Sequence, residues 1–227
     1  MAGDVEEVLG RLRTMARPGG REGMARFGIN PDRALGVRIP DLRRLARELG
    51  RDHRLALALW ATGVHEARIL ASMVDDVDRV TERQVEEWAR DFDSWDLCDQ
   101  VCGNLFDRTS FAVRKAHDWA AGEPEFVKRA GFALMAWRAV HQRQAPDREF
   151  LDYMPVIEGQ ASDDRNYVKK AVSWALRQIG KRNRRLHRAA ISSAQRIADQ
   201  DSRPARWVAA DALRELRSRA VLGRLAS

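Results

Sequence analysis

The sequence predicts an all-α protein built from antiparallel helix pairs. Apolar residues recur at three- and four-residue spacing through most of the 227 positions, and no segment shows the convincing two-residue alternation of a half-buried strand. Short segments containing proline or glycine separate these stretches, and none resembles an interdomain linker. We therefore expect a single domain over residues 1–227.

The helical segments carry recognisable start signals. Pro40 stands in the first turn of a helix over 40–49. Thr81 is a candidate N-cap within 75–92, where TERQ is similar to a capping box. Further helices are expected over residues 111–121, 125–141, 147–157, 165–180, 184–198 and 204–219. Segments of this length and number predict roughly six helix pairs.

Three of these helices begin with related sequences. They are FVKRAGFAL (126–134), YVKKAVSWAL (167–176) and WVAADALREL (207–216). Their leading aromatic residues are 41 and then 40 positions apart, and the aromatic-Val openings are most simply core features. This period is typical of HEAT-like repeats, in which each helix pair buries its apolar side against the next. The predicted fold is a right-handed solenoid of HEAT-like antiparallel helix pairs, with a concave basic groove.

The net charge of +7 is distributed unevenly. Residues 165–227 hold 16 basic and 4 acidic residues, whereas residues 1–164 hold 24 basic and 29 acidic residues. A basic end on an acidic body is expected of a protein that binds a polyanion, most often nucleic acid; a solvated arginine-rich surface is the alternative. In the repeat register, Arg129 and Lys170 are equivalent and would form a basic stripe. KRNRRLHR (181–188) is expected to contact DNA phosphates, or else to be a charged turn.

Several classes of protein are disfavoured. The longest apolar run falls far short of the ~18 residues of a membrane span, and MAGDVEEVLG has acids where a secretory signal has basic residues. Cys98 and Cys102 are four apart, a poor spacing for a disulfide, and neither cysteine nor histidine spacing fits a metal site. We expect packed, reduced thiols in a cytoplasmic protein that holds no metal.

The segment SWDLCDQVCGNLF (94–106) combines apolar helical spacing with an aromatic–acid pair. Trp95 and Asp99 are four residues apart and therefore share one helix face. Taken singly, Trp95 is more simply a core tryptophan, and Asp99 is more simply a surface acid or a member of a structural ion pair. Asp96 is turned to a different face, so we expect it to be structural, orienting a neighbouring helix.

Trp174 lies four residues after Lys170, on the same face. Its equivalent in the preceding repeat is Ala133, so repeat packing does not require a tryptophan here. Indole faces attract cations, carboxylates stabilise developing positive charge or activate water, and arginine and lysine hold phosphates. Together these groups suit a cationic, alkylated purine nucleotide, whose base leaves readily and whose N-glycosidic bond breaks with oxocarbenium character.

The sequence blocks resemble the DNA alkylation repair family of HEAT-like repeat proteins, the AlkD-type alkylpurine DNA glycosylases. The resemblance covers nearly the whole chain, through GREGMARFGI, SWDLCD, FVKRAGFAL and YVKKAVSWALRQIGKRN, in this order and spacing. It implies a hydrolase that excises N3- and N7-alkylated purines from duplex DNA without a metal or cofactor. It also implies that the lesion is not buried in a tight base pocket. A non-catalytic module of the same fold, binding nucleic acid or protein, is the alternative.

The resemblance also implies roles for individual residues. Trp95 matches the family's tryptophan next to the lesion, Asp99 its catalytic aspartate, and Trp174 its second active-site tryptophan. Arg129 matches the arginine that binds the DNA backbone and supports catalysis. Phe27 stands where the family's tyrosine is expected, which keeps an aromatic surface without the hydroxyl. Further DNA contacts are expected from Lys170, Arg177, Lys181 and Arg182. We expect a monomer, cytoplasmic and associated with the nucleoid when bound to double-stranded DNA.

Overall fold

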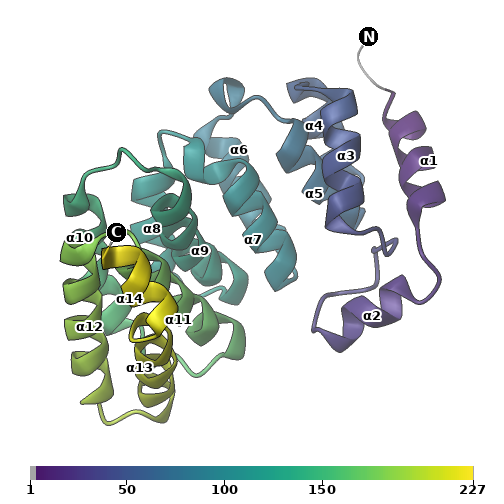
Figure 1. Ribbon diagram of the computed structural model, residues 1–227. Helices are drawn as coiled ribbons and strands as arrows, with labels where there is room; N and C mark the ends of the chain where they lie inside the picture. Colours follow the sequence, from purple (N-terminus) through teal and green to yellow (C-terminus); the bar gives the residue numbers. More distant parts are fainter. Residues whose placement is uncertain (1–3, 227) are drawn as a thin grey trace. The chain divides into compact units, whose positions relative to one another are not determined.

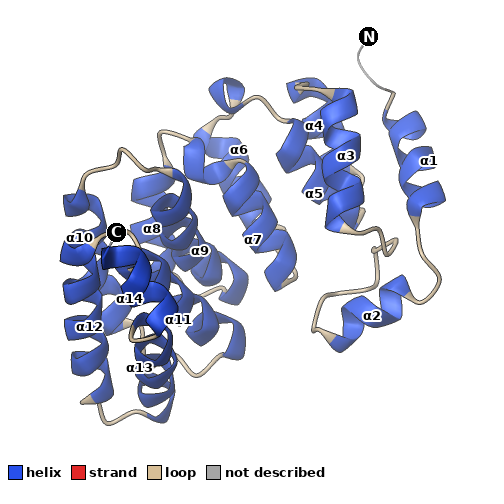
Figure 2. Ribbon diagram, in the orientation of Figure 1, coloured by secondary structure: helices blue, strands red, loops and turns tan. Residues whose placement is uncertain are grey.

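The computed structural model describes residues 4–226, and over this range the chain forms fourteen α-helices, two short 3-10 helices and no strand (Figures 1 and 2). The predicted all-α class is confirmed. The chain divides into two compact units, one ending at Thr109 and the other beginning at Ser110. That residues 1–227 form a single domain stays a prediction.

The N-terminal unit contains the first seven α-helices. These elements are α1 (Val5–Met15), α2 (Gly20–Arg26), α3 (Ile39–Leu49), α4 (His53–Ala61), α5 (His65–Val74), η1 (Val77–Arg79), α6 (Glu82–Arg90), α7 (Trp95–Asn104) and η2 (Phe106–Arg108). The helix α5 is central, because it packs against α3, α4 and α7. Most of its residues are buried.

The C-terminal unit contains the other seven. They are α8 (Ala112–Ala120), α9 (Glu125–His141), α10 (Asp147–Gly159), α11 (Asn166–Gly180), α12 (Arg184–Ala198), α13 (Arg203–Leu216) and α14 (Arg219–Ala226). The helices α9, α11 and α13, which carry the three related sequences, pack in that order, α11 against both others. Each predicted boundary here lies within a few residues of the observed one, although 204–219 is divided between α13 and α14.

The aromatic-Val pairs that begin the three related sequences are only partly buried in the core. Val168 and Val208 are fully buried, whereas Trp207 is 40% exposed and Tyr167 is half-buried. The expectation was therefore right for these valines and wrong for these aromatic residues, because adjacent helical residues point about 100° apart. The rings instead contact neighbours at the surface. The ring centroids of Phe126 and Tyr167 are 5.6 Å apart, and the Lys169 ammonium lies 5.5 Å from the centroid of the Trp207 ring.

The segment 75–92 does not form one helix. Thr81 is the N-cap of α6, as predicted, and its hydroxyl accepts from the Gln84 amide nitrogen at 3.2 Å. The Gln84 side chain, however, donates to the carboxylate of Asp75 at 2.6 Å. This bond satisfies a buried acid and does not form the capping box. Asp75 also contacts His53 Nδ1 at 2.6 Å. The Gln84 side chain therefore bonds the carboxylate of Asp75, and not the backbone nitrogen of Thr81 as in a capping box.

Three expectations from composition can be compared with the described residues. Cys98 and Cys102 are buried and are not joined in a disulfide, as predicted for packed thiols. Within residues 4–226, no helix has the length and apolar character to cross a membrane. Across the same part of the chain, no cluster of three His, Cys, Asp or Glu side chains is arranged to hold a metal ion.

Candidate functional site

Trp95 begins α7 and is held by the end of α2. Its indole Nε1–H donates to the backbone carbonyl of Phe27 at 2.9 Å. The Trp95 side chain is half-buried, and the Phe27 ring is 74% exposed. Both aromatic residues predicted for this unit thus belong to one surface region, although they are 68 positions apart in the sequence.

The two carboxylates of WDxxD have different surroundings. Asp96 Oδ2 lies 2.9 Å from His65 Nε2, which joins α7 to α5 and confirms the structural role expected for Asp96. His65 is buried, and burial opposes its protonation. The hydrogen bond and charge of Asp96 outweigh that effect, so the pKa of His65 is raised above its ordinary value.

Asp99 lies one turn after Trp95 and is half-buried. Burial, a hydrogen bond with Cys98 and the charge of Asp99 together raise the pKa of the Cys102 thiol. The carboxylate of Asp99 is thus close enough to the Cys102 thiol to affect its pKa, whereas Asp96 contacts His65. The catalytic role implied for Asp99 stays a prediction.

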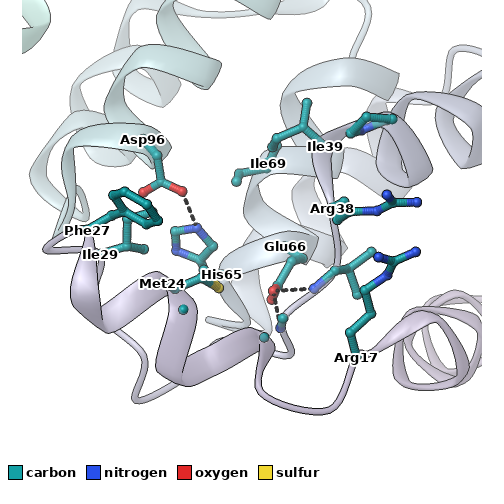
Figure 3. Close-up of a pocket in the computed structure, with 15 residues that line it drawn as sticks. Arg17, Met24, Phe27, Ile29, Arg38, Ile39, His65, Glu66, Ile69 and Asp96 are labelled. Atoms are coloured by element: carbon teal, nitrogen blue, oxygen red, sulfur yellow. Dashed lines mark hydrogen bonds and ion pairs between the residues drawn. The ribbon is translucent and has the colours of Figure 1, made fainter.

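A cavity of about 470 Å³ lies beside this region in the N-terminal unit. Figure 3 shows Phe27 and Asp96 on one side of it and the guanidinium groups of Arg17 and Arg38 on the other. The lining is mostly apolar, with residues such as Met24 and Ile69 between these polar ends. The cavity could not be predicted from the sequence, because its walls come from α2, α3, α5, α7 and the segment before α3.

Two glycines allow one wall of the cavity to form. Gly36 has φ +84°, and a Cβ added to it would lie 2.9 Å from the Cα of Gly20. A Cβ on Gly20 would lie 2.8 Å from the carbonyl oxygen of Gly36. Real Cβ atoms do not approach backbone so closely, so α2 reaches the segment before α3 only because both residues are glycine.

Glu66 stabilises the same segment before α3 through hydrogen bonds to its backbone. Its buried carboxylate accepts hydrogen bonds from the backbone nitrogens of Leu35 (2.8 Å), Gly36 (2.6 Å) and Val37 (3.1 Å). Three amide donors satisfy a charge that would otherwise be costly to bury. From the sequence alone, Glu66 is an ordinary first-turn acid, so no local signal pointed to this role.

In the C-terminal unit, Arg129 is nearly buried, at 6% exposure. Its Nη1 donates to the backbone carbonyl of Tyr167 at 2.6 Å. Lys170, its equivalent in the next repeat, is exposed. The two residues therefore differ in exposure, because α11 packs against α9 and its Tyr167 carbonyl receives the Arg129 guanidinium. The basic stripe stays a prediction. The DNA-binding role of Arg129 stays a prediction.

Trp174 is half-buried and belongs to an aromatic cluster. Its ring meets Trp137 edge to face, with centroids 5.5 Å apart and an interplanar angle of 87°. Trp137 stacks in turn on His141 at 4.9 Å. Trp137 was not among the residues predicted for the site, although a tryptophan and a histidine four residues apart on one helix share a face and could have indicated it.

Two of the cations expected to contact DNA pair with acids of α13. Arg177 forms ion pairs with Glu215 and with Asp211, the latter at 3.5 Å. The Lys181 ammonium lies 2.6 Å from Glu215. Burial opposes ionisation of Glu215, but Lys181 and Arg177 outweigh it and hold its pKa below the usual value. These contacts restrain both cations within the protein.

Arg182 makes more contacts within the protein than Arg177 or Lys181 does. Its guanidinium donates to the carbonyls of Ala139, Gln142, Arg143 and Ala145, at 2.7 to 3.4 Å. It also lies 4.0 Å from the centroid of the Phe150 ring. The last carbonyls of a helix lack intrahelical donors, and a cation satisfies them well. For Arg182, the alternative of an inter-helix turn fits these contacts better than a phosphate contact.

Comparison with known proteins agrees with the fold. A model described as "DNA alkylation repair enzyme" matches residues 8–216. A solved structure, described as belonging to "a new family of proteins related to the HEAT-like repeat DNA glycosylases with affinity for branched DNA structures", is 18% identical, with a TM-score of 0.79. The alignment covers 98% of this chain and 96% of that one, which confirms the HEAT-like fold. No curated protein matches the sequence.

Proposed function

Because this chain belongs to the DNA alkylation repair enzyme family, we propose that it is a DNA glycosylase acting on cationic N3- and N7-alkylated purines in duplex DNA. The observation that supports this most is the arrangement at the start of α7. There the Trp95 indole is oriented by the Phe27 carbonyl, and Asp99 lies one turn further along the helix. The lesion of such a substrate is a cation, for which an indole face and a carboxylate are suitable neighbours.

The proposed chemistry is hydrolysis of one bond. The C1′–N bond of the alkylated nucleotide breaks, and the electron pair leaves with the base, which becomes neutral because it carried a positive charge. Asp99 stabilises the oxocarbenium character that develops on the deoxyribose and positions the attacking water. Water adds to C1′ and releases a proton, for which Asp99 is the acceptor. The products are a free alkylpurine and an abasic deoxyribose.

Residues of the C-terminal unit have supporting roles in this proposal. Trp174 offers a second indole, whose orientation is restrained by Trp137. Arg129 binds the DNA backbone, and its contact with the Tyr167 carbonyl limits the directions its guanidinium can take. Lys170 is exposed on the same face of α11, one turn before Trp174, and provides a phosphate contact.

The proposal is tested by measuring release of free N7-methylguanine and N3-methyladenine from methylated duplex DNA. The wild-type protein should release them, and Asp99→Asn should not do so above the spontaneous rate. Unmodified duplex DNA, which contains no cationic base, is the substrate control. Absence of release by correctly folded wild-type protein would contradict the proposal.

A second candidate function is binding of branched DNA without base excision. It is favoured by the solved structure of similar fold, which is described as related to the glycosylases and as having affinity for branched DNA. Gel-shift titrations with a four-way junction and a linear duplex of equal length would test it. Strong preference for the junction, together with no release of alkylpurine, would select this candidate.

A further inference from the structure

The cavity of the N-terminal unit has no role in the proposed excision chemistry. Its volume of about 470 Å³ falls within the range of small-molecule sites. Apolar side chains form the middle of its wall, from Met24 in α2 and Ile39 in α3 to Ile69 in α5. Such a surface suits a planar ring, and the exposed Phe27 ring at one side offers a stacking partner.

One end of the cavity is basic. Figure 3 shows the guanidinium groups of Arg17 and Arg38 on the side opposite Asp96. Both arginines are exposed, and Arg38 uses its Nε for an ion pair with Asp41 at 3.2 Å. They belong to a stretch, residues 11–54, that contains twelve arginines and five acids. This positive stretch lies within residues 1–164, in which acidic residues outnumber basic ones overall. Its arginines suit a phosphate.

The opposite end carries a carboxylate oxygen that needs a donor. Asp96 Oδ2 is engaged by His65, but Oδ1 is buried and has no hydrogen-bond partner among the described residues. Glu66 does not share this property, because backbone amides satisfy both of its oxygens. A buried acceptor without a donor is costly, and an N–H group of a ligand would satisfy it after a small adjustment of the side chain.

We propose that this cavity binds one unpaired purine nucleotide of a DNA strand. The base lies between the apolar wall and Phe27, an N–H of its edge donates to Asp96, and its phosphate contacts Arg17 and Arg38. The inference rests on the DNA binding of the proposed function but not on base excision. The site adjoins the Trp95–Asp99 pair and shares Phe27 with it, but neither Trp95 nor Asp99 lines the cavity. The nucleotide that it takes is one that is already extrahelical.

The test uses the full-length protein and a duplex with one bulged 2-aminopurine, a fluorescent purine that keeps an exocyclic amino group. The wild type should bind this duplex about tenfold more tightly than the fully paired duplex. The fluorescence of 2-aminopurine should fall as the base stacks. A duplex with a bulged abasic residue should bind like the paired duplex, because it lacks the base.

Matched variants separate the cavity from general DNA binding. Arg17→Ala with Arg38→Ala should remove most of the preference for the bulge, whereas Arg26→Ala, which removes an exposed arginine outside the lining, should keep it. Ile39→Trp, at a half-buried lining position, should fill the cavity and abolish the preference. Circular dichroism and thermal unfolding would establish that each variant is folded.

Several results would overturn the inference. They are equal binding of bulged and paired duplexes by the wild type, equal binding of base-containing and abasic bulges, and an unchanged preference in folded Ile39→Trp. If free dAMP competed with an affinity comparable to that of the bulged duplex, the cavity would be a site for a free nucleotide. That result would contradict the assignment to DNA. Asp99→Asn should keep the preference for the bulge, so failure of excision and failure of this site give different results.

Discussion

His65 Nε2 lies 2.9 Å from Asp96 Oδ2 and joins the first residue of α5 to the first turn of α7. Only 3% of the His65 side chain and 14% of the Asp96 side chain are exposed, so water screens this pair weakly. This pairing distinguishes the roles of the two acids in WDxxD. Asp96 stabilises the packing of α7, and Asp99 is the acid to which we assign chemistry.

The first prediction concerns Asp99→Asn. The substitution preserves shape and removes charge, so the fold and the affinity for undamaged duplex DNA should change little. Excision of N7-methylguanine should fall on the order of 10²-fold or more, as expected when preorganised charge stabilisation of a transition state is lost. Single-turnover base release and a binding titration on the same protein would measure both quantities.

Asp96→Asn is the matched control. It breaks a buried charged hydrogen bond to His65 and should lower the free energy of unfolding by about 2 kcal/mol. At a temperature where the variant is folded, its single-turnover excision rate should stay near that of the wild type. Loss of excision in folded Asp96→Asn, with activity retained in Asp99→Asn, would reverse the assignment of the two acids.

The second prediction separates the face of Trp95 from its N–H group. Trp95→Ala removes the indole and should reduce excision of cationic lesions by about 1–2 kcal/mol of transition-state free energy. Trp95→Phe keeps an aromatic face but loses the hydrogen bond to the Phe27 carbonyl, so its loss of excision should be smaller. A larger defect in Trp95→Phe than in Trp95→Ala would show that the ring face contributes nothing.

The third prediction is a pH dependence of stability. Burial opposes protonation of His65, but Asp96, Glu66 and Asp93 outweigh it, so the pKa of His65 is raised above its ordinary value. The stabilisation is therefore fully present below the unfolded-state pKa and is lost as the pH rises through the higher folded-state pKa. Denaturant unfolding from about pH 5.5 to pH 9 should show the gap in stability between wild type and His65→Asn narrowing as pH increases. A gap that widens with pH would contradict the raised pKa.

The fourth prediction contrasts two cations of the C-terminal unit. Arg182→Ala removes the donor to several carbonyls at the end of α9 and should lower the free energy of unfolding by about 2 kcal/mol. Lys170→Ala should leave stability almost unchanged and reduce the slope of DNA affinity against salt by ~1, as one phosphate contact is lost. A reduced salt slope in folded Arg182→Ala, without loss of stability, would restore the phosphate contact first predicted for it.

The fifth prediction concerns the approach of Gly20 to Gly36. Gly36→Ala places a Cβ 2.9 Å from the Gly20 Cα at a positive φ and should destabilise the N-terminal unit by about 1–3 kcal/mol. Gly10→Ala is the control. Gly10 lies inside α1 with nothing near the added Cβ, so alanine should stabilise the protein by up to about 1 kcal/mol. Thermal unfolding of both variants would distinguish the two effects.

The helices, the repeat of about 40 residues and the separation of Asp96 from Asp99 could all be predicted from the sequence. These features follow from contacts within three or four residues, or from a period that recurs along the chain. The pairing of Asp96 with a neighbouring helix could be expected as well, since a residue one step from Trp95 points to another side of α7. His65 could not be identified as the partner, because it is 31 positions away.

The roles of Arg129, Arg182 and Glu66 depended on tertiary packing. Each side chain is a cation or an acid of ordinary appearance in the sequence, and each is buried or restrained by backbone groups about 30 to 40 residues distant. Such contacts arise where packed helices leave backbone carbonyls or amides without partners, which no local pattern encodes. The cavity has the same origin, because α2 can approach the segment before α3 only where Gly20 and Gly36 meet.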